Sequence, residues 1–196
     1  LYILKHSEAK IAVVESEREL TQLRQVRSEL PNVDTIIVLD PEFSESSPDE
    51  HVYTFDDIME LGFQSPVETE MLYRRRRQET MSDDVATVMY TSGTTGTPKG
   101  IPLTHRNIMH NVEVLPDLLH MSGDNRFLSL LPVWHILERT SEYLALRVGA
   151  SIWYTTRLMF ARDLGTVSPT HVVSVPRIWV LLYDGVMASL RQKGKE

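Results

Sequence analysis

The sequence contains no cysteine among its 196 residues, and this absence excludes several kinds of chemistry. Disulfide bonds, thiolate nucleophiles and cysteine-ligated zinc sites cannot form in such a chain. No apolar run approaches the roughly 20 residues that a membrane-spanning helix needs. The start, Leu1-Tyr2-Ile3-Leu4-Lys5, lacks an initiator Met and does not have the charged-then-apolar pattern of a signal peptide. We therefore expect a cytoplasmic protein, and a chain cut from something longer.

Positive charge is scarce relative to negative charge, with 20 Lys and Arg against 27 Asp and Glu and a formal net charge of −7. A broad nucleic-acid surface needs clustered Lys and Arg, so we expect no nucleic-acid partner. The run Arg74–Arg77 is an exception. Because acidic residues flank it and no aromatic residues are interleaved, we interpret it as a solvated, flexible segment rather than a nucleic-acid or membrane site.

The first eighty residues have the pattern of a strand–helix–strand unit. Ile11–Val14 is a short β-branched run that suits a buried strand. Ser16 is a suitable N-cap for the next helix, whose apolar residues recur at helical spacing until Pro31. Thr35–Leu39 is a second buried strand, so the three elements predict a parallel crossover.

The rest of the chain alternates between strand-like and helix-like segments. We expect strands at 85–90, 127–131, 152–154 and 172–175, and helices at 104–115, 135–147, 158–164 and from 176 onward. This alternation predicts an α/β fold of mostly parallel sheets flanked by helices, with ligands beyond the carboxyl ends of the strands. We divide the chain into a portion at 1–80 and a portion at 81–196.

The most informative segment is Tyr90-Thr91-Ser92-Gly93-Thr94-Thr95-Gly96-Thr97-Pro98-Lys99-Gly100. Its three glycines let the backbone approach a ligand and turn N–H groups inward as an anion-binding nest. Its hydroxyl groups suit phosphate oxygens, and Lys99 adds a positive charge for the β- and γ-phosphates. We expect this segment at a strand-to-helix junction, with a pocket for a triphosphate.

Three better-known motifs do not match this segment. A Walker A loop needs Gly-Lys-Ser/Thr five residues after its first glycine, where this chain has Pro98-Lys99-Gly100. The glycine spacing is not that of a dinucleotide fingerprint. The hydrolase elbow also fails, because Tyr90 stands at the position of its first glycine.

The segment resembles the phosphate-binding signature of the adenylate-forming superfamily, which includes acyl-CoA synthetases, luciferases and nonribosomal adenylation domains. A second stretch, Leu131-Pro132-Val133-Trp134-His135-Ile136-Leu137-Glu138-Arg139, stands where that family has another signature. Further matches lie at 2–10, 122–124 and 169–177. The resemblance covers essentially the whole chain, and it looks most like the long-chain fatty-acid branch.

The resemblance implies a two-step ligase reaction. A fatty-acid carboxylate attacks the α-phosphate of ATP to give an acyl-adenylate and pyrophosphate, and a thiol, most simply that of coenzyme A, then displaces AMP. Lys99 would neutralise the departing pyrophosphate, and Thr91 or Thr94 would meet Mg²⁺ or an oxygen beside it. The implied phosphate-binding residues are Thr91, Ser92, Gly93, Thr94, Thr95, Gly96 and Lys99, with Thr94 as the candidate metal contact.

His135 and Glu138 are the other candidate catalytic residues. They stand three apart at the start of an expected helix, so they would share a face. The resemblance places His135 near the acyl carboxylate and the path of the thiol, with Glu138 in support; a satisfied polar contact at a helix end is the alternative. The apolar stripe Ile178, Leu181 and Leu182 is most simply core, with the edge of an acyl tunnel as its alternative.

Several parts of the family pattern have no counterpart in this chain: the Tyr-Gly-x-Thr-Glu segment, the ribose-binding Asp motif, the hinge and the catalytic Lys of the C-terminal domain. We therefore expect a slice of the N-terminal AMP-binding domain, inactive alone, whose partners include the rest of that domain and the C-terminal domain. Two alternatives remain open: acyl carrier protein as the thiol acceptor, and a non-catalytic nucleotide-binding module. Peripheral membrane contact is also open, because fatty acids partition into membranes.

Overall fold

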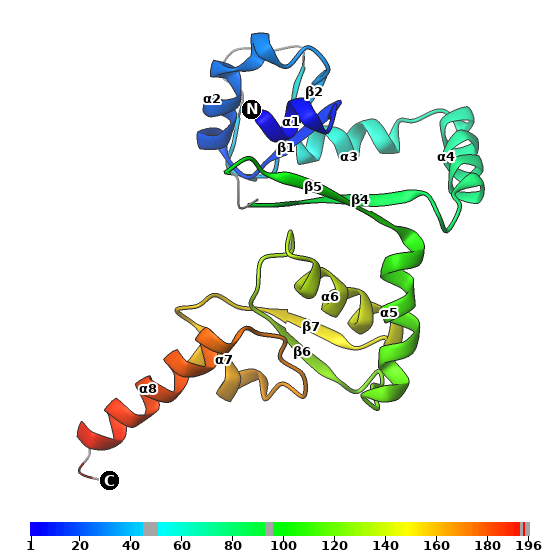
Figure 1. The fold of residues 1–196 in the computed structure, drawn as a ribbon. Helices are drawn as coiled ribbons and strands as arrows, with labels where there is room; N and C mark the ends of the chain where they lie inside the picture. Colours follow the sequence, from blue (N-terminus) through cyan, green and yellow to red (C-terminus); the bar gives the residue numbers. More distant parts are fainter. Residues whose placement is uncertain (45–50, 93–95, 193, 195–196) are drawn as a thin grey trace. The chain divides into compact units, whose positions relative to one another are not determined.

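The computed structural model describes residues 1–44, 51–92, 96–192 and 194, in which helices alternate with short strands (Figure 1). The described strands form three small sheets, of which β1-β2-β3 and β6-β7 are parallel. This confirms the predicted α/β class with parallel sheets flanked by helices.

Contacts gather the chain into two compact units. The first unit contains residues 1–81 and 90–101, and the second contains 82–89 and 102–196. The described residues of the glycine-rich segment therefore belong to the first unit, although they follow the boundary expected at residue 80. That boundary remains a prediction about domain organisation.

The first unit is built on a parallel sheet in the order β1-β2-β3. Ile11 pairs with Thr35, and Ile36 pairs with Val52. Ser16 caps the first long helix as expected: its hydroxyl accepts from the Arg18 N–H at 3.3 Å, within a capping box. The elements are α1 (Tyr2–His6), β1 (Ile11–Val14), α2 (Glu17–Gln25), a 3₁₀ turn (Arg27–Glu29), β2 (Thr35–Val38), β3 (Val52–Thr54), α3 (Phe55–Phe63) and α4 (Val67–Glu79).

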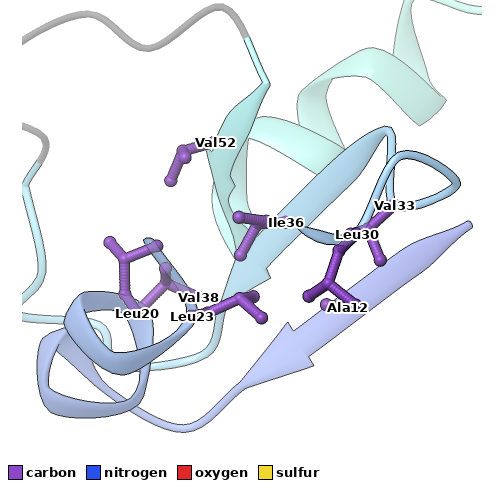
Figure 2. Close-up of a cluster of buried hydrophobic side chains, with 8 residues drawn as sticks. All are labelled: Ala12, Leu20, Leu23, Leu30, Val33, Ile36, Val38 and Val52. Carbon is purple, nitrogen blue, oxygen red and sulfur yellow. The ribbon is translucent and has the colours of Figure 1, made fainter. Parts of the chain in front are cut away.

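A cluster of buried apolar side chains holds this sheet to α2. Leu20 and Leu23 extend from the helix toward side chains of all three strands (Figure 2). The spacing of three residues places both leucines on one helix face. The cluster comprises Ala12, Leu20, Leu23, Leu30, Val33, Ile36, Val38 and Val52.

The arginine run lies in the helix α4, which the sequence analysis did not predict. Arg74 pairs with Glu70 at 2.6 Å, and Arg75 with Glu79 at 3.7 Å, both at the i,i+4 spacing that supports a helix. These four side chains are more than half exposed. The run is solvated, as expected.

The glycine-rich segment connects two paired strands, so the expected strand-to-helix junction was also wrong. β4 (Val85–Thr91) ends at its start, and β5 (Lys99–Thr104) begins at its end. The sequence analysis did not predict β5, because Gly100 and Pro102 are both unfavourable in strands. Each of the two strands contains residues of both units.

The second unit pairs β6 with β7 in parallel, with Phe127 beside Ile152. Two predicted caps are confirmed: Thr104 closes a capping box with Asn107, and Gly149 ends a helix in the left-handed region at φ 74°. The elements are α5 (His105–Leu118), β6 (Arg126–Ser129), α6 (Ile136–Val148), β7 (Ser151–Tyr154), α7 (Phe160–Val167) and α8 (Pro176–Gln192).

The strand expected at 172–175 does not form. One bridge joins His171 to Phe127, where the Leu128 N–H donates to the His171 carbonyl at 3.0 Å and the two rings stack at 4.9 Å. Residues 172–175 are then assigned no strand, and Pro176 begins α8. Among the described residues, no helix is both long and apolar enough to cross a membrane.

Candidate functional site

The ends of the glycine-rich segment are well defined by the β4–β5 pair. Thr91 is the last residue of β4 and Lys99 the first of β5, with Ser92 and Gly96 between them. All four are exposed. The predicted phosphate-binding residues Gly93, Thr94 and Thr95 lie outside the described residues.

Gly96 has a backbone conformation that explains its residue type. Its φ is +83°, in the left-handed region that glycine adopts without steric cost. Apart from its two chain neighbours, no atom of the described residues lies within 4 Å of where a Cβ would be, so the space beside its backbone is open with respect to that part of the chain. The backbone is therefore accessible to a ligand at this point, as an anion-binding loop requires.

Lys99 is available for an anion. Its side chain is exposed, and no ion pair joins it to any residue within the ranges that the structure describes. An ammonium group with no competing carboxylate can bind the phosphate oxygens of an approaching ligand.

His135 occupies the N-cap of α6 rather than its first turn. Its backbone is extended, and its Nδ1 accepts a hydrogen bond from the Leu137 N–H at 3.3 Å. Because Nδ1 is the acceptor, the neutral ring carries its proton on Nε2. The side chain is exposed, so Nε2 is free to meet a ligand.

Glu138 is placed very differently, because it is only 1% exposed. Burial raises the pKa of Glu138, and the nearby Glu142 carboxylate adds to that rise. The polar groups of Ser129 and the Leu131 backbone act on the same carboxyl and oppose the rise. Glu138 is thus a buried acid of α6 that lies near Ser129 of β6 and the backbone of Leu131.

The predicted pair therefore does not present one shared face to a ligand. His135 is exposed, whereas Glu138 is buried with one oxygen, Oε2, that has no hydrogen-bond partner among the described residues. The three-residue spacing of His135 and Glu138 did not indicate that one side chain would be exposed and the other buried.

Sequence reasoning did not single out three neighbours of Glu138. Glu142 lies one turn further along α6, and its carboxylate and burial together raise the pKa of Tyr154 at the end of β7, burial being the larger cause. Arg139 donates to the Thr87 hydroxyl of β4 at 3.0 Å. The i,i+4 spacing of the two glutamates was the one sequence signal that could have found this cluster.

The apolar stripe of α8 is not buried core. Ile178, Leu181 and Leu182 line an open groove of about 490 Å³ between α7 and α8, together with Phe160 and Val186. Leu181 is 49% exposed. The core interpretation was therefore wrong, and a groove wall is what these side chains form.

No group of three or more His, Asp and Glu side chains that could hold a metal ion was found within the described ranges. The candidate metal contact, Thr94, lies outside them. The metal assignment therefore remains a prediction.

The family model described as "AMP-binding enzyme" matches residues 1–196. The chain belongs to this family, which confirms the resemblance carried by its two signatures.

Among its relatives is the chloroplastic long-chain-fatty-acid–[acyl-carrier-protein] ligase AEE15 of Arabidopsis thaliana, 33% identical over 97% of this chain and 27% of the relative. The peroxisomal long chain acyl-CoA synthetase 6 of the same plant is 29% identical over 98% of this chain and 27% of the relative. The chain thus spans about a quarter of the length of these relatives.

Solved structures share the fold. The long-chain-fatty-acid-CoA ligase FadD1 from Archaeoglobus fulgidus aligns with a TM-score of 0.69 over 93% of this chain and 33% of its own, at 22% identity. The anthranilate CoA ligase AuaEII, solved with anthranoyl-AMP, aligns with a TM-score of 0.67 over 91% of this chain and 33% of its own, at 22% identity.

Proposed function

We propose that the full-length protein containing this chain is an ATP-dependent fatty-acid ligase. The carboxylate oxygen of a fatty acid attacks the α-phosphorus of ATP, forming an acyl-adenylate as the bond to pyrophosphate breaks. A thiolate then attacks the acyl carbonyl, a thioester forms and AMP leaves. The observation that carries this proposal is the exposure of Thr91, Ser92, Gly96 and Lys99 in the glycine-rich segment, in a chain whose relatives include a long-chain-fatty-acid–[acyl-carrier-protein] ligase and a long chain acyl-CoA synthetase.

The residues of this connection fit a triphosphate. The backbone at Gly96 is open on one side, and Lys99 is exposed without a competing carboxylate among the described residues. In our proposal Lys99 contacts the pyrophosphate oxygens, where negative charge builds up as the bond breaks. Catalysis by positioning and charge needs no covalent intermediate on the protein.

The phosphate contacts of Thr91, Ser92, Gly93, Thr94 and Thr95 belong to the same proposal. Magnesium bound with ATP would supply positive charge beside the phosphate oxygens. Thr91, or Thr94 outside the described residues, is the hydroxyl that we place beside it.

His135 is proposed to lie beside the acyl carboxylate and the incoming thiol. Its Nε2–H, left free by the Leu137 bond to Nδ1, would donate to a carboxylate oxygen. Glu138 acts through the backbone at Leu131 and is a positioning residue. The groove between α7 and α8 is the surface that we propose to edge the acyl chain.

The thiol acceptor is proposed to be coenzyme A. Acyl carrier protein is the alternative, which the printed name of one relative favours. Thioester assays of the full-length protein with each acceptor separate the two. The names of the relatives refer to chloroplast and peroxisome, so the expected cytoplasmic location stays a prediction, as does peripheral membrane contact.

The central test is Lys99→Ala in the full-length protein, measured by fatty-acid-dependent ATP–pyrophosphate exchange. We expect kcat/KM to fall by about 10²- to 10³-fold, the usual effect of removing one group that stabilises transition-state charge. Lys10→Ala, at another exposed lysine of the first unit, is the matched control and should retain full activity. Unchanged exchange in the Lys99 variant, or ATP binding with no exchange in the unaltered protein, would instead support a non-catalytic nucleotide-binding module.

A further inference from the structure

We propose that His6 is a positioning residue that holds the start of the glycine-rich segment through Tyr90. The inference rests on the proposed function for its effect on ATP. Its structural basis is a contact between residues 84 positions apart in the sequence and within one compact unit.

The helix that carries His6 is anchored independently of the glycine-rich segment. Leu4 packs against the buried cluster of the first unit. Lys5 forms an ion pair with Glu29 at 3.0 Å. Although α1 has only five residues, these contacts fix its place beside the β1-β2-β3 sheet.

The contact itself combines a hydrogen bond with ring packing. His6 Nδ1 lies 2.8 Å from Tyr90 Oη, and the two rings meet edge to face at 5.7 Å and 84°. Tyr2, one helical turn before His6, stacks on the imidazole at 5.4 Å and 29°. The imidazole is thus held by two tyrosines, which restricts the direction of its Nδ1 atom.

Tyr90 directly precedes Thr91 and Ser92, the first proposed phosphate contacts. A hydrogen bond to a ring on an anchored helix restrains the backbone at the point where β4 ends. Restraint before binding lowers the ordering cost that ATP must otherwise overcome, so its loss should weaken ATP binding rather than fatty-acid binding. The ordinary net strength of one hydrogen bond corresponds to about 3- to 10-fold in an equilibrium constant.

The experiment is a double-mutant cycle in the full-length protein with His6→Phe, Tyr90→Phe and the two together. Each substitution keeps an aromatic ring and removes one partner of the hydrogen bond. His110→Phe, at an exposed histidine of α5, is the matched control. Three quantities are measured: the KM for MgATP, the KM for the fatty acid, and amide hydrogen exchange at Thr91, Ser92, Gly96 and Thr97 without ligand.

We expect either single variant to raise the KM for MgATP by about 3- to 10-fold and to speed exchange in the segment, with no larger effect in the double variant. The KM for the fatty acid should not change. The proposal would be overturned if the effects of the two substitutions on the KM for MgATP were additive, or if amide hydrogen exchange did not change. An equal rise in the KM values for MgATP and for the fatty acid would also overturn it. If the protein proves to have no ligase activity, the double-mutant cycle measured by amide hydrogen exchange still decides whether His6 holds this segment, because that measurement needs no substrate.

Discussion

The two signatures of this chain differ in how far their polar side chains are exposed. In the glycine-rich segment, Thr91, Ser92 and Lys99 are exposed, and the space beside the Gly96 backbone holds no described atom. In the second signature, Glu138 is buried against Ser129 and Leu131, and Arg139 is bonded to Thr87. The comparison teaches that the first signature leaves several polar side chains exposed to a ligand, whereas the second buries Glu138 and engages Arg139 in a contact with β4.

Among variants that keep Lys99, the largest effect is expected in the buried signature. Glu138→Ala deletes a side chain that is only 1% exposed and leaves a cavity in its place, so the free energy of unfolding should fall by about 2 kcal/mol. The measurement is chemical denaturation of the full-length protein at pH 5. Glu113→Ala on the exposed side of α5 is the control, and equal losses in the two variants would contradict the buried role.

The next effect tests the open segment. Gly96→Ala puts a Cβ on a residue with φ +83°, which costs about 1–2 kcal/mol although no neighbour clashes. We expect the KM for MgATP to rise about 5- to 30-fold, with the fatty-acid KM unchanged. Gly62→Ala in α3, which has equal free space and no positive φ, should leave both KM values as they are. If Gly96→Ala and Gly62→Ala gave the same KM for MgATP, the backbone conformation of Gly96 would play no part in MgATP binding.

A smaller effect is expected at Arg139. Arg139→Met removes the hydrogen bond to Thr87, which is half-buried, and should lower the free energy of unfolding by about 1 kcal/mol without changing the KM for MgATP. Thr87→Val should do the same, and the double variant should lose no more than either single one. A clear rise in the KM for MgATP would show that Arg139, in the second signature, also affects the binding of MgATP.

The smallest effect is a pH dependence at Glu138. Because burial raises its pKa in the folded state above 4.5, folding favours the protonated acid. The contribution to stability is fully present below pH 4.5 and is lost as the pH rises through the pKa of the folded protein. Glu138→Gln cannot ionise, so its free energy of unfolding relative to the unaltered protein should increase from pH 4.5 to pH 8. A flat difference over that range would show that burial does not disfavour the carboxylate.

Local features of the fold were predictable because they depend on a few neighbouring residues. The caps at Ser16, Thr104 and Gly149 each follow from one side chain, or one backbone conformation, beside the helix end. Strands were harder to predict from the sequence, because a strand forms only where a partner strand lies beside it. β5 formed despite Gly100 and Pro102, and residues 172–175 formed none despite three valines.

For the candidate site, residue types were predictable and their surroundings were not. The composition of 90–100 indicated phosphate binding, which stays a prediction for these residues, and the motifs indicated the family that the family model matches. The burial of Glu138 depends on how α6 packs on β6, and the contact of Tyr90 with His6 joins residues 84 positions apart. No pattern along the chain encodes either.

By itself, the sequence determined the α/β class, the family and the residue types of both signatures, since periodicity, caps and motifs are properties of short stretches. Only the tertiary structure decided which polar groups are buried, which remain open, and which distant side chains hold them. Burial and long-range contacts arise when separate elements pack together, and packing depends on the whole chain at once.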